Sequence, residues 1–117
     1  MNNVEPLAVT ISLGLDRARI FLRGELDLGT APLLRKGVDD VLGKSGEFRS
    51  LVLIDMDELT FCDSSGIRVL LEIADQCGRM GTNLRISNVP DNIRRVLEMS
   101  GANSALNIDS ALTDRHH

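Results

Sequence analysis

The apolar run Leu51-Val52-Leu53-Ile54 constrains the fold of this chain more than any other segment does. Its residues do not alternate with polar ones, which is the pattern of a strand buried on both faces. A segment with helical periodicity, from about Ser64 to Met80, follows it, and a short apolar strand pattern from Leu84 to Ile86 comes next. Because strands that alternate with helices form parallel sheets, the middle of the chain predicts an α/β fold.

Two segments with alternating apolar and polar residues precede this unit, at residues 6–13 and 17–24, and Gly14-Leu15-Asp16 connects them. They predict two strands joined in a hairpin. The following residues, 24–29, break both periods and are expected to form a loop. Residues 55–62, which carry acidic residues at 55, 57 and 58, are also expected to form a loop.

Three helices are predicted from apolar residues at helical spacing. The first begins after Thr30, a candidate N-cap, the second covers Ser64 to Met80, and the third runs from Pro90 to Gly101. Glycines near the predicted helix ends, as expected of C-terminal caps, are Gly43, Gly46, Gly78, Gly81 and Gly101.

Beyond the third helix, Leu106 and Ile108 allow a last strand, and Ser110 allows a cap for a final turn. The element order is therefore β-β-α-β-α-β-α, with or without this β-α tail. It predicts a mixed β-sheet with an N-terminal hairpin, later strands that are parallel, and helices packed on the sheet. The length of 117 residues suits one domain over residues 1–117, with an ordered core over about 5–112.

Composition argues against several classes of partner. The net charge is −4 and the chain has no Trp or Tyr, so direct binding of nucleic acid is not expected. No apolar run approaches the roughly 20 residues of a membrane span, and no signal peptide opens the chain. We therefore expect a cytoplasmic protein without membrane insertion. Cys62 and Cys77 lie among apolar residues and are interpreted as small buried side chains.

Catalytic chemistry is hard to build from this sequence. The only histidines are His116 and His117, at the last two positions, so a Ser–His–acid triad lacks a base. The stretch from Gly37 to Ser45 resembles a P-loop, but it has one residue too many between its glycines and ends a predicted helix instead of following a strand. We expect no metal site, no cofactor and no enzymatic activity.

The motif Asp63-Ser64-Ser65-Gly66 carries the functional question. It opens the second predicted helix, where unpaired backbone N–H groups and the helix dipole favour negative charge. A serine there can cap the helix, act as a nucleophile or carry a phosphate. The nucleophile has no base, and capping by Asp63 or Ser64 needs only one of these residues. Gly66 lowers helix propensity and is expected to leave the backbone open to another molecule.

A phosphate on Ser64 would add about −1.5 to −2 charges at this helix start. The free N–H groups there would tolerate it, so the fold should survive the modification. The surface would change sharply, because Asp63 and the loop from Glu25 to Asp27 are acidic as well. A partner that accepts the neutral hydroxyl would then have to desolvate an unpaired dianion, which opposes binding. Beside the capping interpretation, the motif therefore has the properties of an association switch.

The stretch from Phe61 to Ile67 resembles the F-x-D-S-S/T-G-L/I signature of STAS-domain anti-sigma factor antagonists. Gly24-Glu25-Leu26-Asp27, followed by Thr30-Ala31, resembles the G-E-L/I-D loop of that family. Ile93 to Gly101 resembles its penultimate helix. The three stretches occur in the order and spacing of the family over nearly the whole chain.

The resemblance implies a single STAS-like domain and a cycle of partner switching. The unphosphorylated protein would bind an anti-sigma factor that is also a serine kinase, and would thereby free a sigma factor. The kinase would phosphorylate Ser64, with Ser65 as the alternative, and the phosphoprotein would dissociate until a serine phosphatase restores it. The partner-binding residues that the resemblance implies are Gly24, Glu25, Leu26, Asp27, Thr30, Asp63, Ser64, Ser65, Gly66, Ile67 and Arg68.

An alternative within the same family is a STAS module of a transport complex or of a stress-signalling scaffold that phosphorylation does not control. The sequence also departs from the family at one position. The motif often continues Gly-Leu-Gly, whereas this chain continues Gly66-Ile67-Arg68. Arg68 is either an ordinary exposed helix residue or a cation that pairs with phosphoserine or helps to select a kinase.

Overall fold

The structure is a computed structural model, which describes residues 6–42 and 49–109. Its strands are β1 (Leu7–Leu13), β2 (Arg17–Leu26), β3 (Leu51–Cys62) and β4 (Asn83–Ser87). Its helices are α1 (Ala31–Leu42), α2 (Ser64–Met80) and α3 (Asp91–Ser100), followed by the short 3₁₀ helix η1 (Ala102–Ser104). This order confirms the predicted β-β-α-β-α-β-α succession.

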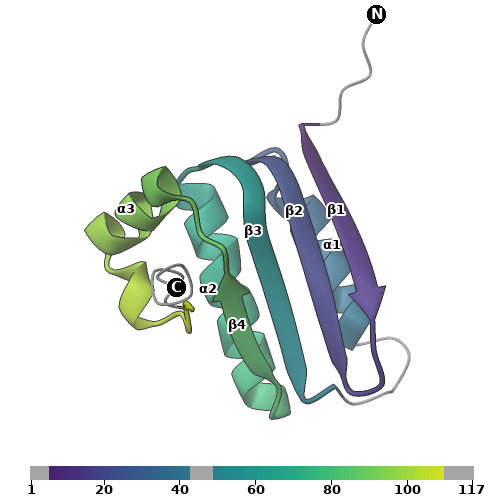
Figure 1. Cartoon of the computed structure of the whole chain (residues 1–117). Helices are drawn as coiled ribbons and strands as arrows, with labels where there is room; N and C mark the ends of the chain where they lie inside the picture. Colours follow the sequence, from purple (N-terminus) through teal and green to yellow (C-terminus); the bar gives the residue numbers. More distant parts are fainter. Residues whose placement is uncertain (1–5, 43–48, 110–117) are drawn as a thin grey trace, which may run out of the picture.

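The four strands form one mixed sheet in the order β1-β2-β3-β4 (Figure 1). β1 and β2 are antiparallel, as the predicted hairpin requires, whereas β2, β3 and β4 are parallel neighbours. Helices α1 and α2 cover one face of the sheet, and α3 lies on the side of β4 (Figure 1). The main core therefore lies between the sheet and the pair of helices α1 and α2.

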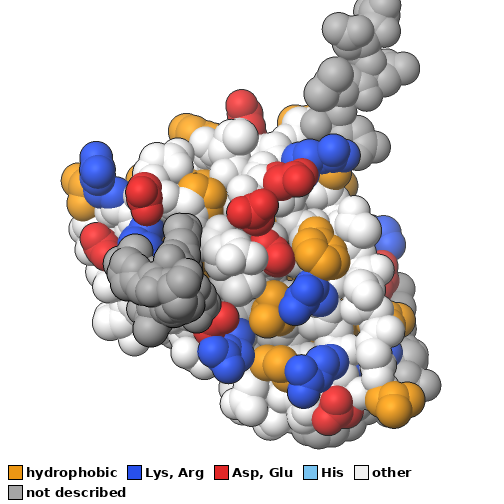
Figure 2. All heavy atoms as spheres, in the orientation of Figure 1, with side chains coloured by type: hydrophobic (Ala, Val, Ile, Leu, Met, Phe, Trp, Pro, Cys, Tyr) orange, Lys and Arg blue, Asp and Glu red, His pale blue; other side chains and the backbone are white. Residues whose placement is uncertain are grey.

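Strand β2 shows how the sequence selects this packing. Ala18, Ile20 and Leu22 are buried, and the residues between them are exposed. Each buried Leu or Ile side chain contributes about 2 kcal/mol relative to exposure, so this alternation fixes which face of the sheet receives the helices. The opposite face, seen in Figure 2, mixes hydrophobic, basic and acidic side chains.

The loop predicted at residues 24–29 is wrong for its first three residues, and the loop predicted at residues 55–62 is wrong throughout. β2 continues to Leu26 and β3 continues to Cys62, and these two residues are paired at the ends of the strands. The register between β2 and β3 shifts twice in this stretch, which marks β-bulges. Each bulge inserts an extra residue, so the alternation that identifies a strand in the sequence is lost here although the pairing persists.

Gly24 lies at one of these register shifts, with a φ of +113°. A Cβ atom at this position would overlap the carbonyl oxygen of Pro6, which also accepts a hydrogen bond from the Glu25 N–H at 2.7 Å. Glycine is therefore required by the bulge and by its contact with the start of β1.

Helices α2 and α3 have the predicted positions. The buried residues of α2 form one broad side and are Gly66, Ile67, Val69, Leu70, Ile73 and Cys77. Gly81, with a φ of +75°, caps the C-terminus of α2, whereas Gly78 lies inside the helix instead of ending it. α3 begins after Pro90 and ends at Gly101, as predicted.

The last strand that Leu106 and Ile108 allowed is reduced, in the described chain, to one isolated parallel bridge between Ile86 and Ile108. The single turn of η1 precedes it and was not predicted. Gly43, Gly46 and Ser110, for which helix caps are predicted, lie outside the described residues.

Both cysteines are free thiols and are buried, which confirms their interpretation as packing residues. Burial raises the pKa of the Cys62 thiol to about 11, and the neighbouring Asp63 carboxylate acts in the same direction. Burial also raises the pKa of Cys77 to about 11, and the cationic Arg35 partly opposes this effect. Neither thiol has the lowered pKa of a reactive cysteine.

Candidate functional site

The two stretches that the sequence singled out meet at one edge of the sheet. Leu26 and Cys62 pair at the carboxyl ends of the parallel strands β2 and β3. The N–H of Asp63 then donates a hydrogen bond of 3.2 Å to the carbonyl oxygen of Leu26. The connection from β2 to α1 and the start of α2 are therefore neighbours, at the edge where α/β folds generally place their functional residues.

Asp63 is the N-cap of α2. Its Oδ1 accepts hydrogen bonds from the N–H groups of Ser65 at 2.9 Å and of Gly66 at 3.1 Å. The Asp63 carbonyl oxygen accepts a further bond from the Ile67 N–H at 3.0 Å. The prediction that Asp63 or Ser64 caps the helix is thus confirmed for Asp63. Such a cap stabilises a helix by about 1 kcal/mol.

Ser64 is exposed at the first position of α2. Its hydroxyl forms no hydrogen bond with any described residue. Because Asp63 supplies the cap, the fold does not need the Ser64 side chain. Ser65 is half-buried, and its N–H is engaged by Asp63. The two serines therefore differ in access as well as in position.

The connection from β2 to α1 is closed by its own hydrogen bonds. The Thr30 hydroxyl accepts a bond from the Asp27 N–H at 2.9 Å and donates one to the Glu25 carbonyl oxygen at 2.8 Å. In return, the Asp27 carboxylate accepts a bond from the Thr30 N–H at 3.1 Å. Thr30 directly precedes α1 as predicted, but its hydroxyl binds the preceding loop instead of capping the helix.

The eleven residues predicted to bind a partner divide by burial. Glu25, Ser64 and Arg68 are exposed, and Gly24, Asp27, Asp63 and Ser65 are half-buried. Leu26, Thr30, Gly66 and Ile67 are buried, so they lie beneath the surface and determine its shape.

The expectation that Gly66 leaves the backbone open to another molecule is wrong. A Cβ atom on Gly66 would lie 2.8 Å from Cys62 Sγ and 2.8 Å from the Leu26 carbonyl oxygen. The space beside Gly66 is therefore filled by the ends of β2 and β3. This glycine allows α2 to start directly against the sheet.

An apolar groove next to the motif was missed by the sequence analysis. It has a volume of about 310 Å³ and lies between the beginnings of α1 and α2. Its lining residues are Leu28, Ala31, Pro32, Arg35, Ser65, Arg68, Val69 and Glu72. Leu28 is 75% exposed and contributes an apolar side chain to this groove. No sequence pattern distinguishes an exposed loop leucine from a buried one.

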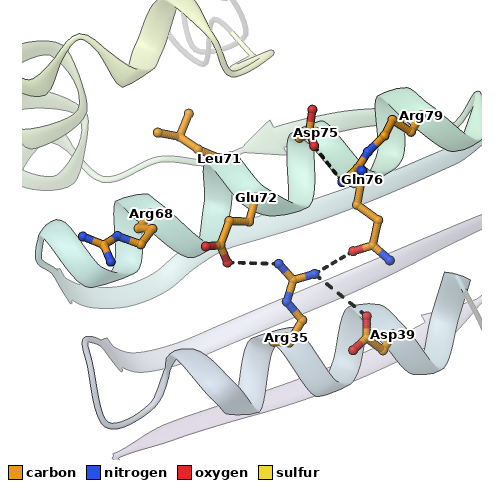
Figure 3. A pocket seen from close by; sticks show the side chains of 8 residues that line it. All are labelled: Arg35, Asp39, Arg68, Leu71, Glu72, Asp75, Gln76 and Arg79. Atoms are coloured by element: carbon orange, nitrogen blue, oxygen red, sulfur yellow. Dashed lines mark hydrogen bonds and ion pairs between the residues drawn. The ribbon is translucent and has the colours of Figure 1, made fainter.

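A second groove, of about 640 Å³, adjoins the first along α1 and α2 and shares Arg35, Arg68 and Glu72 with it (Figure 3). Arg35 reaches from α1 to the Gln76 side-chain oxygen at 2.6 Å and to the Glu72 carboxylate at 3.2 Å. Farther along α2, Arg79 pairs with Asp75 at 2.7 Å. The charged side chains along the helices thus neutralise one another.

Arg68 is the exception in this groove. It forms no ion pair or hydrogen bond with the described part of the chain. Figure 3 shows its guanidinium pointing away from Glu72 and towards the start of α2. An unpaired cation therefore lies beside the motif, one turn after Ser64.

Two further observations concern residues 6–42 and 49–109. They contain no group of three or more His, Cys, Asp or Glu side chains placed to hold a metal ion. None of their helices is long and apolar enough to cross a membrane. His116 and His117 lie outside the described residues.

Comparison with known proteins places this geometry in a family. The chain is 26% identical to the anti-sigma-B factor antagonist of Listeria monocytogenes over 93 residues. This matched stretch is 80% of this chain and 79% of that protein. Among solved structures, an anti-sigma factor antagonist from Mycobacterium paratuberculosis matches with a TM-score of 0.77 and 20% identity, over 92% of this chain and 89% of that one.

Two other solved structures have a similar fold. The Bacillus cell fate determinant SpoIIAA in its phosphorylated form matches with a TM-score of 0.66 and 19% identity, over 94% of this chain and 100% of that one. A sulfate transporter family protein from Wolinella succinogenes matches with a TM-score of 0.69 and 28% identity, over 82% of this chain and 75% of that one. The STAS domain family model matches residues 14–114, which is most of the sequence, and the chain therefore belongs to the STAS domain family.

Proposed function

We propose that this protein is an anti-sigma factor antagonist whose binding is switched by phosphorylation of Ser64. The unphosphorylated form binds a cytoplasmic anti-sigma factor that is also a serine kinase, and a sigma factor is released. Phosphorylation of Ser64 separates the pair, and a serine phosphatase resets the protein. In this cycle the chain is acted upon and supplies no catalytic group of its own. The relatives named as antagonists support this role.

The observation that carries the proposal is the division of roles at the start of α2. Asp63 holds the helix with its carboxylate, while the exposed Ser64 hydroxyl has no partner in the described structure. A residue that the fold does not use is available to a kinase. That SpoIIAA has a solved phosphorylated form, with a fold similar to this one, agrees with a fold that survives the modification.

The surface around Ser64 is suited to a partner that binds the unphosphorylated protein and dissociates after phosphorylation. The apolar groove with the exposed Leu28 offers hydrophobic contact area. The half-buried Asp27 directly precedes Leu28 in the sequence, and the half-buried Asp63 lies two residues before Ser65, which also lines the groove. A dianion at Ser64 would have to be desolvated when the groove is covered. Removing a charged group from water costs several kcal/mol, which is sufficient to separate a complex of ordinary affinity.

Ser65 is the alternative phosphorylation site, but the structure favours Ser64. Ser65 is half-buried and lines the apolar groove, so a kinase would reach its hydroxyl less easily. The test is to incubate the protein with its cognate anti-sigma kinase and ATP, and then to map the phosphate by peptide mass spectrometry. We expect one phosphate, on Ser64, and none in Ser64→Ala. A phosphate on Ser65 alone, or none on either serine, would contradict the proposal.

A second candidate is a STAS module in an anion-transport complex, without control by phosphorylation. It is favoured by the 28% identity to the sulfate transporter family protein. Affinity capture with the unphosphorylated protein separates the two candidates, because the first predicts a kinase-type anti-sigma factor and the second a transport protein. Capture that is unchanged by Ser64→Asp would favour the second candidate.

A further inference from the structure

The start of α2 offers a phosphate on Ser64 little backbone support. Of the first four N–H groups, those of Ser65 and Gly66 donate to the Asp63 carboxylate, and that of Ile67 donates to the Asp63 carbonyl oxygen. The N–H of Ser64 itself is the one without a partner among the described residues. The helix end that normally receives an anion is therefore largely occupied by Asp63, and the expectation that free N–H groups there would tolerate the phosphate is wrong for three of the four groups.

The carboxylates near Ser64 would repel the phosphate. Asp63 precedes it directly, and Asp27 follows Leu26, whose carbonyl oxygen binds the Asp63 N–H. Of the cations lining the adjoining grooves, Arg35 is held by Glu72 and Gln76, and Arg79 is held by Asp75. Arg68 alone among them is unengaged within the described chain.

Arg68 also has the right position to reach the phosphate. It lies four residues after Ser64 in the same helix, and side chains with this spacing are neighbours on one face. Side chains in a helix lean towards its N-terminus, and Figure 3 shows this direction for Arg68. Glu72, which lies four residues beyond Arg68, does not compete, because Arg35 binds it at 3.2 Å.

We propose that Arg68 changes partners when Ser64 is phosphorylated. In the unphosphorylated protein its guanidinium is a free cation at the rim of the apolar groove, open to an acidic group of the bound partner. In the phosphoprotein it pairs with phosphoserine 64 within the same helix. This inference rests on the proposed function, because it describes how phosphorylation of the same serine acts.

The consequence is a switch with two effects. Phosphorylation adds a dianion to the contact surface and at the same time withdraws a cation from it. Charge-assisted bonds between a guanidinium and a phosphate are roughly twice as strong as neutral hydrogen bonds, so the phosphate competes well for Arg68. The pair also supplies the counter-charge that the occupied helix start lacks, and the fold of α2 is preserved.

The inference is tested with phosphoserine placed at position 64 during translation, so that neither kinase nor partner is needed. The titration midpoint of the phosphate is measured by ³¹P NMR in the full chain. A phosphoserine ordinarily titrates near pH 6, and an adjacent cation lowers this value. We expect Arg68→Gln to raise the midpoint by about 0.5 pH unit. Arg68→Lys should restore part of the difference.

Arg95→Gln is the matched control, because Arg95 is exposed on α3 and the substitution removes the same charge. We expect it to leave the midpoint unchanged. Equal midpoints in the parent, Arg68→Gln and Arg95→Gln would overturn the inference, as would equal shifts in both variants. Melting temperatures of the unphosphorylated variants establish that each is folded.

Failure of this inference and failure of the proposed function give different results. If the midpoint does not depend on Arg68 but the kinase still modifies Ser64, only the role of Arg68 is wrong. If the midpoint depends on Arg68 but no kinase or partner responds to Ser64, the pairing is real and the proposed function is wrong.

Discussion

The connection from β2 to α1 and the start of α2 are neighbours at one edge of the sheet, and they use their polar groups differently. In the connection, the side chains of Thr30 and Asp27 are engaged in hydrogen bonds within the connection itself. At the start of α2, Asp63 and Gly66 hold the backbone, while Ser64 and Arg68 are unengaged within the described chain. The connection from β2 to α1 therefore serves mainly as a scaffold. At the start of α2, one set of residues stabilises the fold and another set is available for regulation.

The largest effect on stability is expected when the packing at Gly66 is disturbed. In Gly66→Val the new side chain would overlap the Leu26 carbonyl oxygen and Cys62 Sγ, so the free energy of unfolding should fall by about 3 kcal/mol. Gly78→Ala, in the same helix, is the control because no atom lies within 4 Å of its added Cβ. We expect it to raise stability by about 0.5–1 kcal/mol. Urea denaturation measures both, and equal effects would contradict the packing role.

The next effect is expected in the scaffold. Thr30→Val removes the buried hydroxyl that binds Asp27 and Glu25, and should lower the free energy of unfolding by about 2 kcal/mol. Thr30→Ser keeps the hydroxyl and loses one methyl group, so its effect should be about half as large. If urea denaturation showed a larger free energy of unfolding for Thr30→Val than for Thr30→Ser, the hydrogen bonds of the hydroxyl would not be what stabilises this connection.

A smaller effect separates the two polar residues at the start of α2. Asp63→Ala removes the cap and should lower the free energy of unfolding by about 1 kcal/mol, whereas Ser64→Ala should change it by less than about 0.5 kcal/mol. Asp63→Asn, which retains an oxygen acceptor, should recover most of the loss. Thermal unfolding of the three variants distinguishes them. An equal loss in Ser64→Ala would mean that Ser64 serves the fold after all.

The sequence predicts those helices and strands whose bounds depend on patterns of neighbouring residues. The bounds of α2 follow from its caps and from apolar residues at helical spacing, and β1 and the beginning of β2 follow from alternation. The ends of β2 and β3 could not be predicted, because bulges break the alternation while pairing between strands distant in sequence continues. The sequence identifies the motif Asp63-Ser64-Ser65-Gly66, but it does not show why a glycine is needed at position 66. The atoms beside Gly66 belong partly to Leu26, forty residues earlier.

Two features of the site depend on tertiary contacts alone. The exposure of Leu28 and the groove beside it arise from the way α1 and α2 approach each other. The free state of Arg68 arises because Arg35 reaches across from α1 and binds Glu72, the residue that helical spacing would otherwise pair with Arg68. Neither fact is visible in a pattern along the chain.

The most direct measurement is the affinity of the captured partner for the unmodified protein and for the protein with phosphoserine at position 64. We predict that isothermal titration calorimetry shows a loss of at least about 100-fold, or about 2.7 kcal/mol, while the melting temperature stays within about 3 °C. Equal affinities would contradict the claim that Ser64 controls association. A large fall in melting temperature would show that the phosphate acts on the fold and not on the partner.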